Sequence, residues 1–117
     1  MQEHRRFRRM EFRAPVQFYF LEGAGQPRAH PGTAAGAVSC DLGEGGIRMH
    51  VNDFIACNKN LAVNFELGPE KNIGITGRVV WAQRIPHSES YHIGVKFEDT
   101  PGNRPSRDAV AQFLAKV

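Results

Sequence analysis

The chain has 117 residues, which favours one domain with a single hydrophobic core. It carries 15 Lys and Arg against 12 Asp and Glu, and the excess lies at one end, because Arg5, Arg6, Arg8, Arg9 and Arg13 all precede residue 14. Its 2 cysteines are too few for a disulfide framework, no apolar run approaches the roughly 20 residues of a membrane span, and the arginine-rich start lacks the apolar stretch of a signal peptide. We therefore expect a cytoplasmic protein with no membrane contact and an anionic partner at the arginine-rich end.

Alternating apolar and polar residues predict six strands. In chain order they centre on residues 16–20, 35–41, 47–51, 61–67, 73–81 and 93–97, and the second is the weakest. Because unpaired strand edges promote aggregation, we expect these strands to close into an all-β, antiparallel six-stranded barrel over residues 13–100. The side chains expected in its core are Phe18, Phe20, Val63, Phe65, Val79, Trp81, Val95 and Phe97.

The pattern changes from strand to helix after Pro105. Apolar residues recur at helical spacing from residue 110 to residue 117, and Ser106 can cap the first turn. We expect an α-helix over residues 106–117 whose apolar face packs on a barrel opening or on a partner. Together with a flexible arginine-rich arm at residues 1–12, these elements form a single domain over residues 1–117.

Sequence motifs of the common enzyme classes are missing. The chain has no H-E-x-x-H, no G-x-S-x-G and no Walker loop, and its 5 histidines are scattered without the spacing of metal ligands. We therefore expect a binding module with no catalytic residues, no metal and no resident cofactor.

Two short segments hold the residue types that bind nucleotides. Residues 5–9 contain four arginines, which stay charged, form bidentate bonds with phosphate or with guanine O6 and N7, and stack on bases. Residues 41–46 place the carboxylate of Asp41 in a loop with three glycines between two predicted strands, where it can accept bonds from guanine N1 and N2. Taken alone, the first segment is more often a solvated basic tail and the second a plain glycine turn. Together they fit a ligand that has both guanines and phosphates.

These segments give the chain a resemblance to the PilZ domain family, over roughly residues 3–100. The family carries an R-x-x-x-R motif before a β-barrel and a [D/N]-x-S-x-x-G motif between barrel strands. Arg5 and Arg9 match the first motif, with Arg6 as the common additional arginine. Residues 77–81 and 94–97 are similar to the family's late strands.

The second family motif is matched at its ends by Asp41 and Gly46, and Gly43 stands where the family has serine. The missing hydroxyl removes one hydrogen bond, worth about 0.5–1.5 kcal/mol, which leaves room for a member that binds the family ligand weakly or not at all. The family ligand is the bacterial second messenger cyclic di-GMP. The residues that the resemblance assigns to it are Arg5, Arg6, Arg9, Asp41, Gly43 and Gly46.

The resemblance implies a receptor for cyclic di-GMP that signals to a downstream protein partner when its N-terminal arm becomes ordered on the ligand. Two alternatives stay open. One is a PilZ-like interaction module that binds no nucleotide, which Gly43 favours. The other is a barrel for single-stranded nucleic acid, which ranks third because most aromatic residues fall in the predicted core rather than on an exposed basic face.

Overall fold

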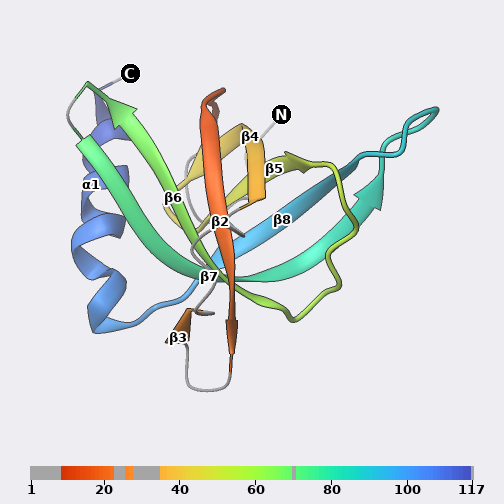
Figure 1. Cartoon of the computed structure of the whole chain (residues 1–117). Coiled ribbons are helices and arrows are strands. Elements are labelled where there is room, and N and C mark those ends of the chain that lie inside the picture. Colours follow the sequence, from red (N-terminus) through yellow and green to blue (C-terminus); the bar gives the residue numbers. More distant parts are fainter. Residues whose placement is uncertain (1–8, 23–25, 28–34, 70, 117) are drawn as a thin grey trace, which may run out of the picture.

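The structure is a computed structural model that describes residues 9–22, 26–27, 35–69 and 71–116. The described chain is mostly strand and ends in one helix (Figure 1). The elements in chain order are β1 (Arg9–Glu11), β2 (Pro15–Glu22), β3 (Gln26–Pro27), β4 (Ala35–Gly43), β5 (Gly46–Val51), β6 (Asn60–Gly68), β7 (Lys71–Arg84), β8 (Tyr91–Phe97), the 3-10 turn η2 (Pro101–Asn103) and α1 (Arg104–Ala115).

Six of these strands close into an antiparallel barrel in the order β4-β5-β8-β7-β6-β2, and β2 returns to pair with β4. The two remaining strands are short additions, β1 on β4 and β3 on β2. This confirms the predicted all-β, six-stranded barrel with a C-terminal helix. Strands form where apolar side chains alternate because this period places one set of side chains inside the barrel.

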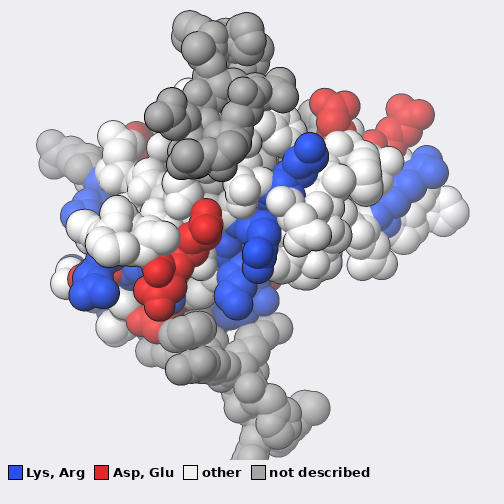
Figure 2. Space-filling view, turned by 90° about the horizontal axis from the view of Figure 1, so that it is seen from below, with Lys and Arg blue, Asp and Glu red and all other residues white. Residues whose placement is uncertain are grey.

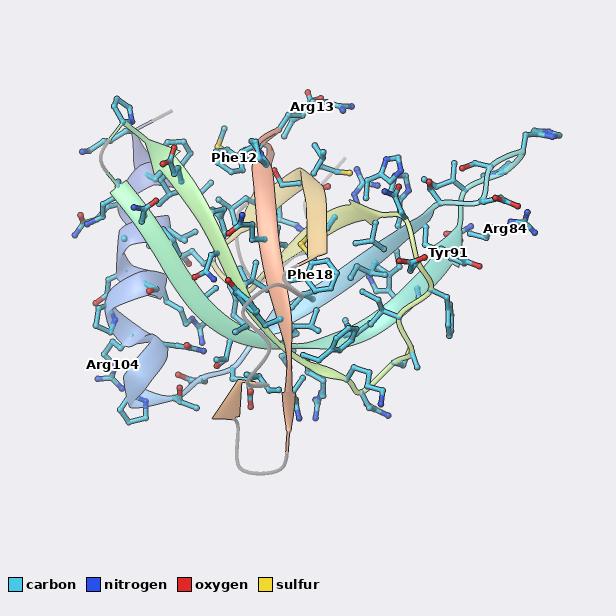
Figure 3. The ribbon with its side chains drawn as sticks, in the orientation of Figure 1. Phe12, Arg13, Phe18, Arg84, Tyr91 and Arg104 are labelled. Atoms are coloured by element: carbon cyan, nitrogen blue, oxygen red, sulfur yellow. The ribbon has the colours of Figure 1, made fainter. Side chains whose placement is uncertain are left out.

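The barrel interior is filled by the apolar phase of every strand, as the alternating burial of β5 and β6 shows. Among the predicted core residues, Phe18, Val63, Phe65, Val79, Val95 and Phe97 are buried. Phe18 points into the barrel in Figure 3. The barrel is therefore a packed core rather than a channel.

Two predicted core residues are wrong, since Phe20 and Trp81 are each 37% exposed. Phe20 lies beyond Phe18, the last β2 residue that pairs with β4, so it reaches the barrel rim. Trp81 follows an extra residue, Val80, where the pairing of β7 with β8 shifts register. Such a bulge moves the next side chain to the other face, which places Trp81 outside.

Helix α1 begins at Arg104, two residues before the predicted start, and packs beside β7 along one side of the barrel (Figure 1). Ser106 is not the cap, because its hydroxyl donates to Gly74 O at 2.8 Å. Instead, the buried Asn103 fixes the helix start: its amide bonds the backbone N and O of Thr76 at 3.1 and 2.9 Å. Val110 and Leu114 are buried against the barrel, as the apolar spacing predicted.

The segment assigned to the arm is partly strand. Within the described residues of that segment, β1 pairs with the end of β4, and Phe12 packs edge-on against Phe65 and Phe113 at ring distances of 6.1 and 5.6 Å. Residues 1–8 lie outside the described residues. No helix of the described chain is long and apolar enough to cross a membrane.

Candidate functional site

A tight hairpin between β4 and β5 brings the charged side chains of Asp41 and Arg48 together. Its turn has two residues, Glu44 and Gly45, so Leu42 pairs with Ile47 and Asp41 pairs with Arg48. Arg48 Nε lies 2.9 Å from Asp41 Oδ2. Both side chains stand on the outer surface of the barrel, because Leu42 and Ile47 beside them fill the core.

Strand β1 brings Arg9 to the same carboxylate. Its register pairs Arg9 with Gly43 and Glu11 with Asp41, and Arg9 Nη2 lies 3.1 Å from Asp41 Oδ1. The side chains of Arg9 and Asp41 are 29% and 22% exposed. The structure therefore brings together one residue from each of the two sequence motifs.

The chain that follows β1 is anchored on β4 by the fully buried Ser39. Its hydroxyl accepts a bond from Ala14 N at 2.9 Å and donates to Phe12 O. Backbone bonds add to this anchor, from Phe12 N to Cys40 O and from Ser39 N to Ala14 O, each at 3.0 Å. A register shift between Ser39 and Asp41 lets Ser39 point inward while Asp41 stays outside.

The charges around Asp41 are close but poorly aligned. Asp41 Oδ1 and Arg48 Nε are both buried, and neither makes a well-formed hydrogen bond with any described residue. Both atoms lie in ion pairs, at 3.1 and 2.9 Å, so their charges are compensated while their hydrogen-bond geometry is poor. Buried atoms of this kind are rare and often mark a binding site.

A small cavity of about 310 Å³ opens beside this cluster. Its wall includes Arg9, Arg13, Arg48 and His92 together with Asp41. Burial, followed by the charges of Arg48 and His50, lowers the pKa of His92 below its ordinary value of 6.5. His92 is therefore mainly neutral at pH 7, and the arginines supply the positive charge.

A larger cavity of about 730 Å³ shares Arg9 with the first and extends over the outer surface of β5, β8 and β7. Its size is within the range of small-molecule sites. Its charged lining consists of Arg9, Arg78, Lys96, Arg107, Glu98 and Asp99, with the loop glycines Gly43, Gly45 and Gly46 beside them. Figure 2 shows the underside of the molecule, where Lys and Arg side chains gather in a band with acidic side chains next to it.

Two glycines on this outer surface allow other groups to approach the backbone closely. A Cβ at Gly46 would lie 2.3 Å from Val95 O, so only glycine allows β5 to approach β8 there. A Cβ at Gly94 would lie 2.2 Å from Trp81 Nε1, which means that the Trp81 ring lies over bare backbone. The surface beside Asp41 thus offers a partly exposed aromatic ring.

The structure places four of the six predicted site residues. Arg9 and Asp41 are in contact, Gly43 is buried at the end of β4, and Gly46 opens β5. Arg5 and Arg6 lie outside the described residues.

Sequence reasoning missed Arg48 and Trp81 as neighbours of this site. Arg48 had a usable signal, because a two-residue turn at residues 44–45 of the predicted hairpin places it opposite Asp41. Trp81 had only an ambiguous signal, since the apolar run at residues 79–82 interrupts the alternation but does not show which of these side chains face the core.

Among solved structures, three similar folds have low sequence identity. They are the inhibitor of motility MotI/DgrA from Bacillus subtilis (TM-score 0.67, 16% identity, 98% of this chain and 53% of that chain), the PilZ domain of YcgR from Escherichia coli with c-di-GMP (0.63, 12%, 97% and 94%) and the MrkH–c-di-GMP complex from K. pneumonia (0.57, 17%, 98% and 54%). The chain spans about half the length of MotI and of MrkH. At these identities the likeness shows the fold.

No curated protein matches this sequence. The PilZ domain family profile, in contrast, matches residues 3–116, which is nearly the whole chain. The match includes both motifs and all the barrel strands, and the barrel itself has the architecture of the YcgR PilZ domain. On these grounds the chain belongs to the PilZ domain family.

Proposed function

We propose that this protein is a receptor for cyclic di-GMP, which it binds on the outer barrel surface around Asp41. One observation carries the proposal: Asp41 Oδ1 is buried between Arg9 and Arg48 without a well-formed hydrogen bond from any described residue. Guanine N1–H and N2–H are donors that match a carboxylate. Arginine matches the remaining groups of the ligand, the phosphates and the Hoogsteen edge of guanine.

Binding in this scheme is an exchange of partners. Arg9 leaves Asp41 Oδ1 and moves to the ligand, and a guanine edge takes its place on the carboxylate. Arg48 stays on Oδ2 and holds the carboxylate in position. The net change replaces a poorly aligned ion pair with charge-assisted hydrogen bonds, which are about twice as strong as neutral ones.

The signalling step follows from the position of Arg9 at the start of β1. Arg5 and Arg6 are four and three residues before it, so they close over the ligand when Arg9 engages it. The ordered arm then presents a new surface to a downstream protein partner. Two similar solved structures, the YcgR PilZ domain and MrkH, hold c-di-GMP, which supports this ligand.

Calorimetric titration with cyclic di-GMP tests the proposal and gives affinity and stoichiometry together. Arg9→Gln and Asp41→Asn should each weaken binding about tenfold to a hundredfold, because each removes a bond to a charged group. Arg104→Gln and Glu66→Gln are the matched controls, since both residues are exposed outside the two cavities. Wild-type protein that binds no cyclic di-GMP, or tighter binding by Asp41→Asn, contradicts a specific site.

A PilZ-like module without nucleotide binding is the alternative that Gly43 and the doubly paired Asp41 favour. In that case the two arginines neutralise the carboxylate permanently, and the site has no free acceptor. The same titration separates the two functions. A single-stranded nucleic-acid barrel needs a series of stacking aromatics, whereas the described lining of the larger cavity contains one aromatic residue, the buried Phe97, with Trp81 nearby over Gly94.

A further inference from the structure

We propose that Arg78 and Lys96, which belong to neither sequence motif, form a phosphate-binding subsite in the larger cavity. The two residues face each other directly, because Arg78 on β7 is the cross-strand partner of Lys96 on β8. Both side chains are exposed, and both line the cavity of about 730 Å³. The inference rests on the proposed function for the identity of the ligand, whereas the anion subsite itself can be tested separately.

The arrangement of these two cations is unfavourable without an anion. Like charges directly opposite each other on antiparallel strands repel and lower stability. Neither Arg78 nor Lys96 forms a salt bridge with any residue that the structure describes. A bound phosphate would turn this repulsion into two charge-assisted contacts, one of them from the planar fork of an arginine.

The surrounding charges leave the cavity net cationic. The acidic residues of the lining are Glu98 and Asp99. Asp99 pairs with Arg107 at 3.5 Å, so Glu98 is the acidic side chain that remains, two residues after Lys96 in the sequence. Arg9 adds a further positive charge from the other side of the cavity.

The subsite is placed to act together with Asp41. On the outer surface, Asp41, Arg48 and Gly94 lie in one row across β4, β5 and β8, and Lys96 is two residues along from Gly94. From strand spacing and rise, the backbones of Asp41 and Lys96 are about 12 Å apart. Between them Gly94 has no side chain of its own, and the partly exposed Trp81 ring lies over it. One nucleotide can therefore place its base edge at Asp41 and its phosphate at the cation pair.

The test compares Arg78→Gln and Lys96→Gln with Lys71→Gln and Arg104→Gln. Lys71 is an exposed cation on β7, Arg104 is an exposed cation at the start of α1, and neither lines either of the two cavities. Calorimetry with cyclic di-GMP should show about tenfold weaker binding for each of the first two variants and unchanged binding for the controls. The thermal midpoint of the ligand-free Arg78→Gln protein should be equal to or above that of the wild type, since a repulsion is removed.

A second probe, inorganic pyrophosphate, tests the subsite without the guanine. In wild-type protein it should shift the amide NMR signals of Gly46, Arg78 and Lys96, and these shifts should be lost in Lys96→Gln. If cyclic di-GMP does not bind but pyrophosphate shifts these signals, the subsite stands and the proposed function fails. If neither probe acts there, or if cyclic di-GMP binds Arg78→Gln and Lys96→Gln as well as the controls, the subsite is overturned.

Discussion

Arg48 is the side chain that fixes the direction of Asp41. It comes from the strand opposite, and its Nε lies 2.9 Å from Asp41 Oδ2 while Arg9 takes the other oxygen. Of these two arginines, Arg9 stands in a three-residue strand at the beginning of the described chain, whereas Arg48 stands inside the barrel sheet between β4 and β8. In the proposed binding scheme Arg48 would therefore be the positioning residue and Arg9 the exchangeable one.

Arg48→Gln should weaken cyclic di-GMP binding about threefold to tenfold, because Asp41 keeps its charge but loses the contact that orients it. Calorimetry gives this value, and a thermal melt of the same sample shows whether the fold is kept. Lys59→Gln is the control, since Lys59 is exposed and lines neither cavity. An unchanged affinity in Arg48→Gln would show that Asp41 needs no such support.

His92 makes the stability of the barrel depend on pH. Burial and the nearby charges of Arg48 and His50 lower its pKa in the folded protein below 6.5, the value expected in the unfolded chain. The unfolded state then binds the proton more readily, so stability is fully present above pH 6.5 and falls as the pH drops through the lowered pKa. Urea unfolding between pH 7.5 and pH 5 should show this fall, and His92→Gln should reduce it. An equal fall in wild type and His92→Gln would assign the effect to other groups.

At the scale of elements, β4 joins the barrel to the candidate site. The same edge of β4 pairs with β2 through residues 35–38 and with β1 through residues 41–43. Ser39 stands between these two pairings and holds the connecting chain through Phe12 and Ala14. The buried hydroxyl of Ser39 therefore helps to fix Arg9 relative to Asp41, together with the backbone bonds of Phe12 and Ala14 to β4.

Ser39→Ala should lower the free energy of unfolding by about 1–3 kcal/mol, because Ala14 N and Phe12 O lose their buried partner. Cyclic di-GMP binding should weaken as well, since β1 loses its anchor. Chemical denaturation and calorimetry measure the two effects. Ser106→Ala is the matched control, because its hydroxyl also bonds a backbone oxygen, that of Gly74, but on the helix side of the barrel. If Ser39→Ala destabilises no more than Ser106→Ala, the anchor role is wrong.

The strands themselves were predictable from sequence, and their irregularities were not. Alternation located all six barrel strands because the inward set must be apolar. The extra residue at Val80 produces a run of four apolar residues, 79–82, which does not show where the bulge lies, so Trp81 was assigned to the core and lies outside. The helix start was two residues late because the fixing contact is Asn103 on Thr76, a tertiary contact that a local capping pattern does not contain.

The candidate site was predictable to the same extent. The motifs identified Arg9 and Asp41 as site residues. Their contact at 3.1 Å depends on the pairing of β1 with β4, which no local sequence pattern predicts. Arg78 and Lys96 were missed because each is an ordinary outward-facing residue of its strand. Only the pairing of β7 with β8 sets them side by side.

For the whole molecule, the closed barrel concentrates stability in one core. Phe65 is 4% exposed, pairs with Val16 across β2 and β6, and lies against Phe12. Phe54, in contrast, is 62% exposed and touches Tyr91 at the surface. The two phenylalanines allow a comparison of the same substitution inside and outside the barrel.

Phe65→Ala should cost about 3–5 kcal/mol of unfolding free energy, a large share of the stability of a small domain. Phe54→Ala should cost under about 1 kcal/mol, because little apolar surface is lost from the core. Urea denaturation of both variants measures the difference. Equal losses would mean that the assignment of the inner face of β6 is wrong.

The two register shifts that flank the site have a consequence for changes in chain length. Each shift adds one residue to a strand, near Cys40 in β4 and at Val80 in β7. The side chains that follow in the strand therefore face the opposite side of the sheet from the one that unbroken alternation would give them. Deleting Val80 would remove the extra residue and leave Trp81 outside and Ala82 inside, whereas deleting Ala82 would turn Gln83 toward the barrel interior, a change that no single substitution produces. Relatives that keep this outer surface should therefore vary in length at the β7–β8 hairpin and keep the spacing within these two strands constant.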